Sequence, residues 1–159
     1  MSLDTGEFRR ALAQFATGIA IVTGRDPEGR PFGLTVNSFT SVSLQPPLVL
    51  FCLAASSELN APLGHTRVYG VSVLSEDQQD WSTRFATPGA DRFSGVELVD
   101  GEHGVPLVPG ALVWLECRVS DIHPGGDHSI YVGEVLRLEA RPGRPLLYHG
   151  SAYRHLAAD

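Results

Sequence analysis

One long alternating segment, followed by a glycine-rich turn and a second long segment, restricts the fold of this chain most strongly. Apolar and polar residues alternate through residues 112–122, and this period of two is typical of a β-strand with one buried face. The sequence HPGGD at residues 123–127 turns the chain, and residues 128–139 run back. Because a short turn joins antiparallel neighbours, these residues predict an antiparallel hairpin.

Two or three short helices are also expected. Residues 7–15 carry apolar side chains at helical spacing, and Asp4 and Glu7 lie where a capping pair would. The sequence Ser-Ser-Glu at residues 56–58 is typical of a helix start, and residues 76–85 are helical in character.

The remaining strands are short. Runs of β-branched or alternating residues predict strands at residues 19–23, 30–36, 48–53, 68–74 and 146–149. Residues 87–110 are rich in Gly, Pro and Asp and are expected to be mostly loop. With about six or seven strands and no regular strand–helix alternation, the pattern favours a mainly β fold, an antiparallel barrel with short helices at its rim.

Composition limits the classes of protein that this chain fits. Its 159 residues, 43% hydrophobic and 19% charged, predict one globular domain over residues 1–159. The net charge is −6, and no basic run is present. Since phosphate neutralisation supplies most of the affinity for nucleic acids, no nucleic-acid partner is expected.

The cysteines and the apolar runs indicate the compartment. Cys52 and Cys117 lie in apolar, strand-like runs and are expected to be buried thiols, neither a disulfide framework nor a metal site. No apolar run approaches the length of a transmembrane helix, and residues 1–10 lack the apolar region of a signal peptide. We therefore expect no membrane association and a cytoplasmic location.

Residues 33–52, GLTVNSFTSVSLQPPLVLFC, contain the most informative polar segment. Small polar residues fill its first part, and a short apolar strand follows the Pro46-Pro47 pair. Backbone N–H groups and hydroxyls next to a core strand suit a planar polar ligand. The alternative is a Ser/Thr-rich connection between two strands, which is common in proteins.

The absence of several linear motifs argues against several enzyme classes. The chain has no glycine-rich dinucleotide fingerprint and no phosphate-binding loop of the strand–helix kind. It also lacks His-Glu-x-x-His and Gly-x-Ser-x-Gly, and its six histidines have no ligand spacing. Hydrolytic and zinc chemistry therefore have no support, and no metal is expected.

Three positions have two interpretations each. His128 opens a strand after a turn, where it either contacts a ligand or is an ordinary surface histidine. Ser56 and Ser57 either cap a helix or, with the helix N–H groups, bind a phosphate. Asp127 is either a turn residue or an acid catalyst, and the turn favours the first interpretation.

Five segments, in order, cover nearly the whole chain: FATGIAIVT (15–23), GLTVNSFTSVSLQPPLVLFC (33–52), VSVLSEDQQDWSTRFA (71–86), GDHSIYVGEV (126–135) and PLLYHGSAYRHL (145–156). Together they resemble the flavin reductase family of the FMN-binding split barrel.

The resemblance implies a split β-barrel that forms a homodimer and binds FMN or FAD. It implies reduction of the flavin by NADH or NADPH and supply of diffusible reduced flavin to a flavin-dependent monooxygenase. The few Arg and Lys residues favour NADH, because a 2′-phosphate requires a basic partner. Apolar residues in 48–51 and 112–119, more than one small barrel interior needs, agree with a dimer.

The resemblance also implies where the cofactors bind. Residues 35–38 match the segment at the flavin's polar edge, and residues 54–57 match the phosphate and ribityl region. Phe85 and Arg92 match positions near the flavin, and His128 matches a histidine beside the nicotinamide, with a C-terminal aromatic close to it. The full set is Thr35, Val36, Asn37, Ser38, Ala54, Ala55, Ser56, Ser57, Phe85, Arg92, His128 and Tyr153. No catalytic side chain is expected, since the two cofactors carry out the hydride transfer themselves.

One departure and two alternatives accompany this interpretation. Some family members carry a basic residue near Ala55, and here Arg92, helix N–H groups and serine hydroxyls would have to replace it. One alternative is a split barrel that holds flavin without oxidising NADH, which would not need His128. The other is an oxidase of a pyridoxine-type phosphate, which would require more basic residues than this chain has.

Overall fold

The predicted hairpin is the longest element of the computed structural model, which describes residues 3–158. Strands β9 (Val113–Gly125) and β10 (His128–Ala140) pair antiparallel along their length. The turn is shorter than expected, because β9 continues to Gly125 and only Gly126 and Asp127 connect the strands. Gly126 has a φ of +72°, which glycine adopts without steric cost.

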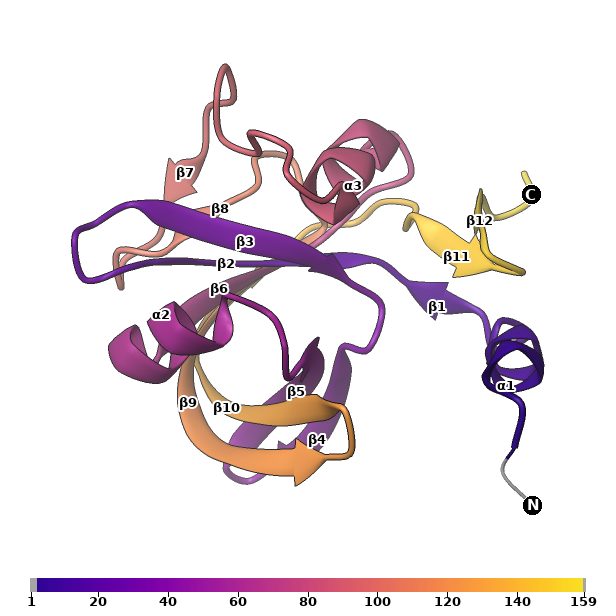
Figure 1. Cartoon of the computed structure of the whole chain (residues 1–159). Coiled ribbons are helices and arrows are strands. Elements are labelled where there is room, and N and C mark those ends of the chain that lie inside the picture. The colour runs from indigo at the N-terminus through magenta and orange to yellow at the C-terminus, as the bar shows by residue number, and fades with distance from the viewer. Residues whose placement is uncertain (1–2, 159) are drawn as a thin grey trace.

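Seven strands form the main sheet, which curls around a core and is antiparallel at every pairing (Figure 1). The order is β3-β2-β6-β9-β10-β5-β4, with β3 and β4 at the two edges. This confirms the antiparallel barrel. The other strands have these bounds: β2 (Ala20–Arg25), β3 (Pro31–Val36), β4 (Thr40–Leu44), β5 (Pro47–Ala54) and β6 (Val68–Val73).

The polar segment contains a strand that the sequence pattern hides. Strand β4 was expected to be part of a polar stretch, yet it pairs with β5. As an edge strand with mostly exposed residues, it does not need the apolar alternation that marks a half-buried strand. The loop expected over residues 87–110 is mostly loop, with two short paired strands, β7 (Val99–Asp100) and β8 (Pro106–Leu107).

The helices differ from expectation at their ends. Helix α1 (Thr5–Leu12) begins after Asp4, whose Oδ1 accepts a hydrogen bond from the Glu7 N–H at 2.7 Å, and this confirms the capping role of Asp4. Helix α2 (Asn60–Thr66) begins later than residues 56–58, so Ser56 and Ser57 do not cap it. Helix α3 (Gln79–Ala86) begins three residues later than expected. The starts of α2 and α3 were both predicted too early because a turn precedes each of these helices.

Two clusters of buried side chains fill the molecule. The barrel interior centres on three aromatic rings, with Phe51 stacked on Tyr131 and edge-on to Tyr69, each at 5.2 Å between ring centroids. The second cluster lies on the other face of β2, under α3, and includes Ile21, Phe85 and Leu146. Cys117 is buried as expected, whereas Cys52 is only half-buried, and both thiols are free.

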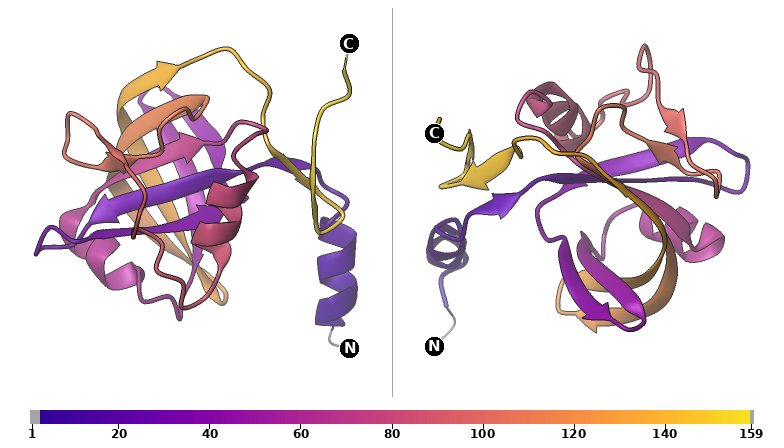
Figure 2. Two further views of the ribbon diagram at one scale, coloured as in Figure 1. Left: turned by 90° about the horizontal axis from the view of Figure 1, so that it is seen from above. Right: turned by 180° about the vertical axis from the view of Figure 1, so that it is seen from behind.

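The N- and C-terminal segments lie together at one side of the barrel (Figures 1 and 2). A small sheet joins β1 (Thr17–Gly18), β11 (Leu147–His149) and β12 (Ala152–Arg154). Helix α1 precedes this sheet, and none of its residues is buried. Within residues 3–158, no helix is long and apolar enough to cross a membrane.

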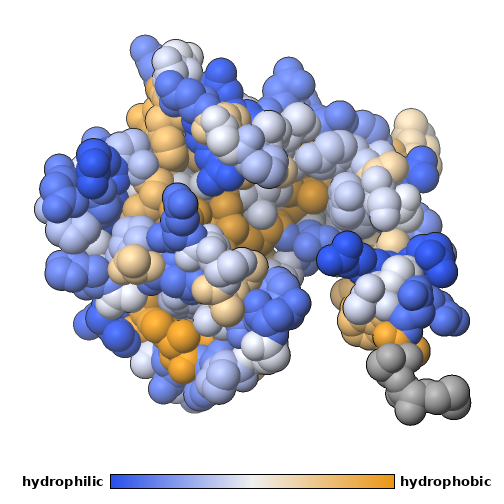
Figure 3. Space-filling view, in the orientation of Figure 1, coloured by the Kyte–Doolittle hydropathy of each residue, from blue (hydrophilic) through white to orange (hydrophobic). Residues whose placement is uncertain are grey.

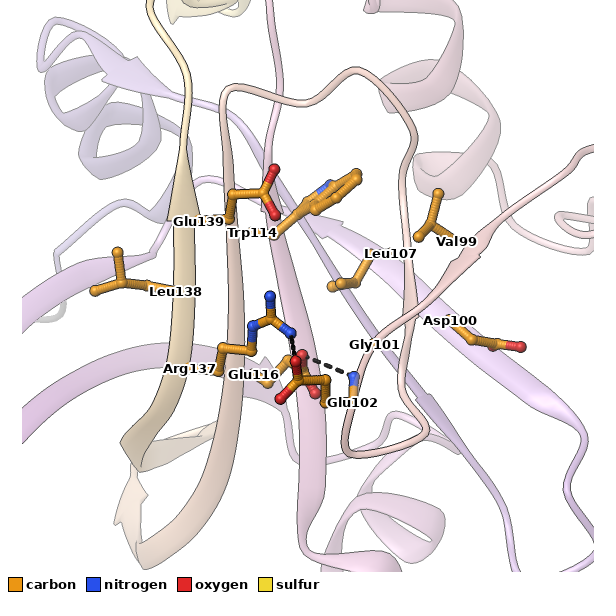
Figure 4. Close-up of a pocket in the computed structure, with 10 residues that line it drawn as sticks. All are labelled: Val99, Asp100, Gly101, Glu102, Leu107, Trp114, Glu116, Arg137, Leu138 and Glu139. Carbon is orange, nitrogen blue, oxygen red and sulfur yellow. Dashed lines mark hydrogen bonds and ion pairs between the residues drawn. The ribbon is translucent and has the colours of Figure 1, made fainter.

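A buried carboxylate on β9 holds the β7–β8 loop against the sheet (Figure 4). Glu116 is 3% exposed, and its oxygens accept hydrogen bonds from the N–H groups of Glu102 at 3.0 Å and His103 at 2.6 Å. The Nδ1 of His103 lies 2.9 Å from the same carboxylate. Burial alone would raise the pKa of Glu116, but these hydrogen bonds outweigh it and lower the pKa below its ordinary value.

Replacing this carboxylate should destabilise the fold in a pH-dependent way. For Glu116→Gln we expect a loss of about 1–3 kcal/mol near neutral pH, the scale for hydrogen bonds to a charged group. Because the folded pKa is lowered, the stabilisation is present above the unfolded value of about 4.3 and is lost as pH falls through the folded value. Urea unfolding at several pH values should show the difference between wild type and variant shrinking in acid. Equal stabilities at neutral pH would contradict this role.

Candidate functional site

A cavity of about 320 Å³ lies where the end of β3, the end of β5 and the start of β10 meet. We call it the central cavity. The register of β10 on β5 places His128 opposite Ala54, so residues far apart in sequence reach the same wall. Seven of the twelve predicted cofactor contacts line it: Thr35, Val36, Asn37, Ser38, Ala54, Ser57 and His128.

The hydroxyls of this wall are not equally available to a ligand. Thr35 Oγ1 donates its hydrogen to the backbone oxygen of Ser82 at 2.7 Å, so its lone pairs remain free to accept from a ligand N–H. Ser38 Oγ accepts from the Cys52 N–H at 2.9 Å and also contacts the Cys52 carbonyl oxygen at 3.4 Å. Thr35 is therefore an acceptor toward the cavity, whereas Ser38 mainly ties this segment to β5.

The loop at residues 54–57 forms the opposite side of the central cavity. Its N–H groups are partly used within the fold: Ala55 donates to the Asp127 carbonyl and Ser57 to the Ala54 carbonyl, both at 2.9 Å. Ser57 Oγ accepts from the Leu59 N–H at 3.3 Å and keeps its own hydrogen for a ligand. The side chains of Ala55 and Ser56 are exposed and do not line the cavity.

His128 is paired with its neighbour in the turn. Its Nδ1 lies 2.7 Å from Asp127 Oδ1. The hydrogen bond and charge of His128 lower the pKa of Asp127, so this carboxylate stays ionised at neutral pH. Nδ1 then carries the hydrogen, which leaves Nε2 free to meet a ligand. Asp127 is a turn residue, as predicted, and it also orients His128.

Tyr153 lies in an adjoining cavity of about 210 Å³, which we call the tyrosine cavity. Its hydroxyl is 2.8 Å from Ser82 Oγ, and its ring meets Tyr148 edge-on at 5.5 Å. The two cavities share residues 35–37. Tyr153 and His128 were expected close to one site, and the structure places them in different cavities that share residues 35–37.

Arg92 and Phe85 lie outside the central cavity. Arg92 Nη1 donates to the Gly33 carbonyl at 2.7 Å beside a third cavity of about 370 Å³. That cavity adjoins the central one, because Gly33 and Glu58 line it and their sequence neighbours Leu34 and Ser57 line the other. Among residues 3–158, Arg92 Nε is one of three buried polar side-chain atoms without a hydrogen-bond partner.

The expectation that Phe85 contacts a cofactor is corrected by its burial. Its side chain has no exposed surface. The ring packs against Trp81 and Phe93, at 6.0 Å and 5.2 Å between centroids. Phe85 therefore packs behind the residues that line the tyrosine cavity. Its neighbour Ala86 is one of the lining residues.

Sequence reasoning missed the residues that hold this wall in place. Ser82 and Asn60 bind segments up to 71 positions away in the chain. No local motif marks such residues, since a serine in a helix or an asparagine at a helix start is ordinary. Their only signal is polarity at a helix position that faces the sheet.

A further cavity of about 190 Å³ lies between the β7–β8 loop and β9–β10 (Figure 4). It shares no lining residue with the three cavities above. The four acids around it are paired: Asp100 with Arg25, Glu102 with Arg137, Glu139 with Arg141 and Glu116 with His103. No charge is left over there to recognise a ligand, so this cavity belongs to the packing of the loop. In residues 3–158, no group of three or more His, Cys, Asp or Glu side chains suits a metal ion.

Comparison with known proteins gives a consistent result. The family model described as "Flavin reductase like domain" matches residues 12–157. The FMN reductase (NADH) SmoA of Agrobacterium fabrum is 46% identical over 150 residues, which cover 94% of this chain and 85% of that protein. The reductase subunit HsaB of a flavin-dependent monooxygenase from Rhodococcus jostii is 37% identical over 159 residues, covering 99% and 81%.

A solved structure agrees with these relatives. The NADH:FAD oxidoreductase SgcE6 of Streptomyces globisporus, in complex with NAD and FAD fragments, superimposes with a TM-score of 0.92 at 38% identity. The match covers 100% of this chain and 99% of that chain.

Proposed function

This chain belongs to the flavin reductase like family, and we propose how its residues carry out the reaction of an NADH-dependent flavin reductase. The protein is an oxidoreductase that reduces FMN or FAD with NADH. It serves as the reductase component for a partner monooxygenase, as relatives of this family do.

One observation carries the assignment of the site: the central cavity gathers residues 35–38, Ala54, Ser57 and His128. The groups present fit a flavin. Thr35 offers an acceptor for an N–H at the polar edge of the ring, and the Ser57 hydroxyl offers a donor for the phosphate. Arg92 lines the adjoining cavity, so its guanidinium is placed to reach the far end of a longer flavin such as FAD.

The protein contributes to the reaction by positioning the two cofactors. The bound nicotinamide supplies the hydride and the bound flavin accepts it, so no protein nucleophile is needed. The wall at residues 35–38 orients the flavin, and His128 Nε2, fixed through Asp127, contacts the nicotinamide side. The paired turn holds this imidazole in one tautomer.

The protein should bind flavin weakly. Residues 54–60 contain no Lys or Arg, and helix α2 starts too late for its N–H groups to assist at Ser56 and Ser57. Because a charged partner would strengthen phosphate binding, its absence favours release. Diffusion of reduced flavin is the route of transfer that we propose.

The first experiment measures NADH oxidation through the nicotinamide absorbance, with and without added FMN or FAD. We expect dialysis to remove flavin and activity, and added flavin to restore activity. Protein that keeps stoichiometric flavin through exhaustive dialysis would contradict transfer by diffusion. Flavin binding without any NADH oxidation would identify a flavin carrier instead of a reductase.

A pair of variants tests the two sides of the central cavity. His128→Ala should raise the KM for NADH or slow hydride transfer, at a cost of about 1–3 kcal/mol, because a positioning contact is lost. Its flavin Kd should change by less than about threefold, roughly 0.65 kcal/mol. Ser57→Ala should weaken flavin binding and leave the NADH step unchanged at saturating flavin. Loss of flavin affinity in His128→Ala, with normal NADH kinetics at saturating flavin, would show that His128 contacts the flavin and not the nicotinamide.

We propose a homodimer on the basis of α1. Apolar side chains on α1 and just after it are exposed, with Phe8 50%, Leu12 59% and, beyond the end of the helix, Phe15 78% accessible. Figure 3 shows apolar surface on the part of the molecule beside the barrel that carries α1. An amphipathic helix with no buried side chain gains little from folding alone. The surplus apolar residues expected in 48–51 and 112–119 mostly alternate into the barrel, so α1 is the better candidate for the interface.

Light scattering at micromolar concentration should give the mass of a dimer. Leu12→Glu should shift it toward the monomer, because a charge would be buried in the contact. Arg10→Gln, on the opposite side of α1, is the control and should leave the mass unchanged. A monomeric wild type with full activity would overturn the dimer.

A further inference from the structure

Asn60 gathers three backbone carbonyls of the loop at residues 54–57. Its Nδ2 lies 2.9 Å from the Ala54 oxygen, 3.2 Å from the Ala55 oxygen and 3.0 Å from the Ser57 oxygen. The amide has two hydrogens, so the three acceptors share them. One side chain therefore sets the direction of most carbonyls in this loop.

A buried tyrosine fixes Asn60 in turn. The Tyr131 hydroxyl donates to Asn60 Oδ1 at 2.7 Å. Tyr131 is 2% exposed, and its ring stacks on Phe51 at 5.2 Å with an interplanar angle of 8°. Since the barrel core holds the ring, it also holds the orientation of the Asn60 amide and, through it, the loop.

This arrangement engages most acceptors of the loop and leaves two of its donors without a partner in the described part of the protein. The carbonyl oxygens of Ala54, Ala55 and Ser57, which would repel an anion, are occupied by Asn60. The Ser57 hydroxyl, which lines the central cavity, keeps its hydrogen. Within residues 3–158, the Ser56 N–H donates to no group of the protein. The Ala55 and Ser57 N–H groups are used within the fold, but a loop with three carbonyls engaged that keeps one N–H and one hydroxyl free still suits a phosphate.

We propose that Asn60 is a positioning residue for recognition of the flavin phosphate. It does not touch the phosphate; it engages the carbonyls of the loop and so leaves the Ser57 hydroxyl at the cavity wall, and the Ser56 N–H next to that wall in the sequence, as the donors for the phosphate. This arrangement substitutes for a basic residue, which residues 54–60 lack. The proposal rests on the proposed function, since it assumes that a flavin occupies the central cavity.

The test compares FMN with riboflavin, which has the same ring and ribityl chain but no phosphate. Equilibrium binding of each to the dialysed full-length protein is followed by flavin fluorescence. For Asn60→Ala we expect the FMN Kd to rise by about tenfold, while the riboflavin Kd changes by less than about twofold. A general loss of structure would weaken both ligands alike, so the ratio of the two constants isolates the phosphate.

Two further variants complete the design. Tyr131→Phe removes only the hydroxyl that orients Asn60, and it should weaken FMN selectively but less than Asn60→Ala. Thr66→Ala removes a hydrogen bond to Pro62 in the same helix, away from the loop, and it should leave the FMN-to-riboflavin ratio of wild type unchanged. If Asn60→Ala fails to fold, Tyr131→Phe alone decides the question.

The outcomes separate this inference from the proposed function. Equal losses for FMN and riboflavin, or none, in Asn60→Ala and Tyr131→Phe would overturn the inference. So would a wild type that binds FMN no more tightly than riboflavin, even if it oxidises NADH normally. A wild type that binds neither flavin and oxidises no NADH would overturn the proposed function itself.

Discussion

The pairing of β10 with β5 is the constraint on which the rest of the site depends. Their register aligns His128 with Ala54 and Tyr131 with Phe51. The first pair brings the turn before β10 next to the loop after β5, and the Ala55 N–H fastens the two through the Asp127 carbonyl. The second pair lies inside the barrel. A shift of one residue would exchange the two faces of the strand. The same register therefore fixes both the packing of the core and the position of the cavity residues.

Buried residues of the core also form hydrogen bonds with residues around the cavities. Tyr131 is a core residue by its ring and a partner of Asn60 by its hydroxyl. On the other side, Ser82 is a fully buried residue of α3. Its carbonyl accepts a hydrogen bond from Thr35, and its hydroxyl is hydrogen-bonded to Tyr153. Such buried hydrogen bonds cost free energy when one partner is removed. They therefore fix the wall positions more firmly than apolar packing alone would.

The sequence predicted the parts of the fold that follow a local period. Alternation at residues 112–122 located β9, because half-buried strands impose a period of two, and the turn that follows located β10 as the returning strand. Strand β4 escaped notice because its exposed position removes that period. Residues 56–58 imitate a helix start because Ser57 closes a turn with the same hydrogen bond that a cap would make.

The candidate site was predictable only where residues belong to recognisable segments. Residues 35–38, Ala54, Ser57 and His128 meet as the family resemblance implied. The resemblance could not show that Phe85 faces inward or that Ser38 is mostly occupied by Cys52, because both depend on contacts between distant strands. For the same reason Asn60 and Ser82 have no sequence signature.

The segment at residues 35–37 separates two cavities and faces both. For anyone redesigning this protein, that stretch is a poor starting point, because a new side chain there alters both compartments at once. Leu53 and Cys52 border only the central cavity, while Tyr148 and Ala86 border only the tyrosine cavity. Independent tuning of the two compartments should begin at these outlying positions. Cys52, half-buried and free, also offers a chemical handle for attaching a reporter group to one compartment alone.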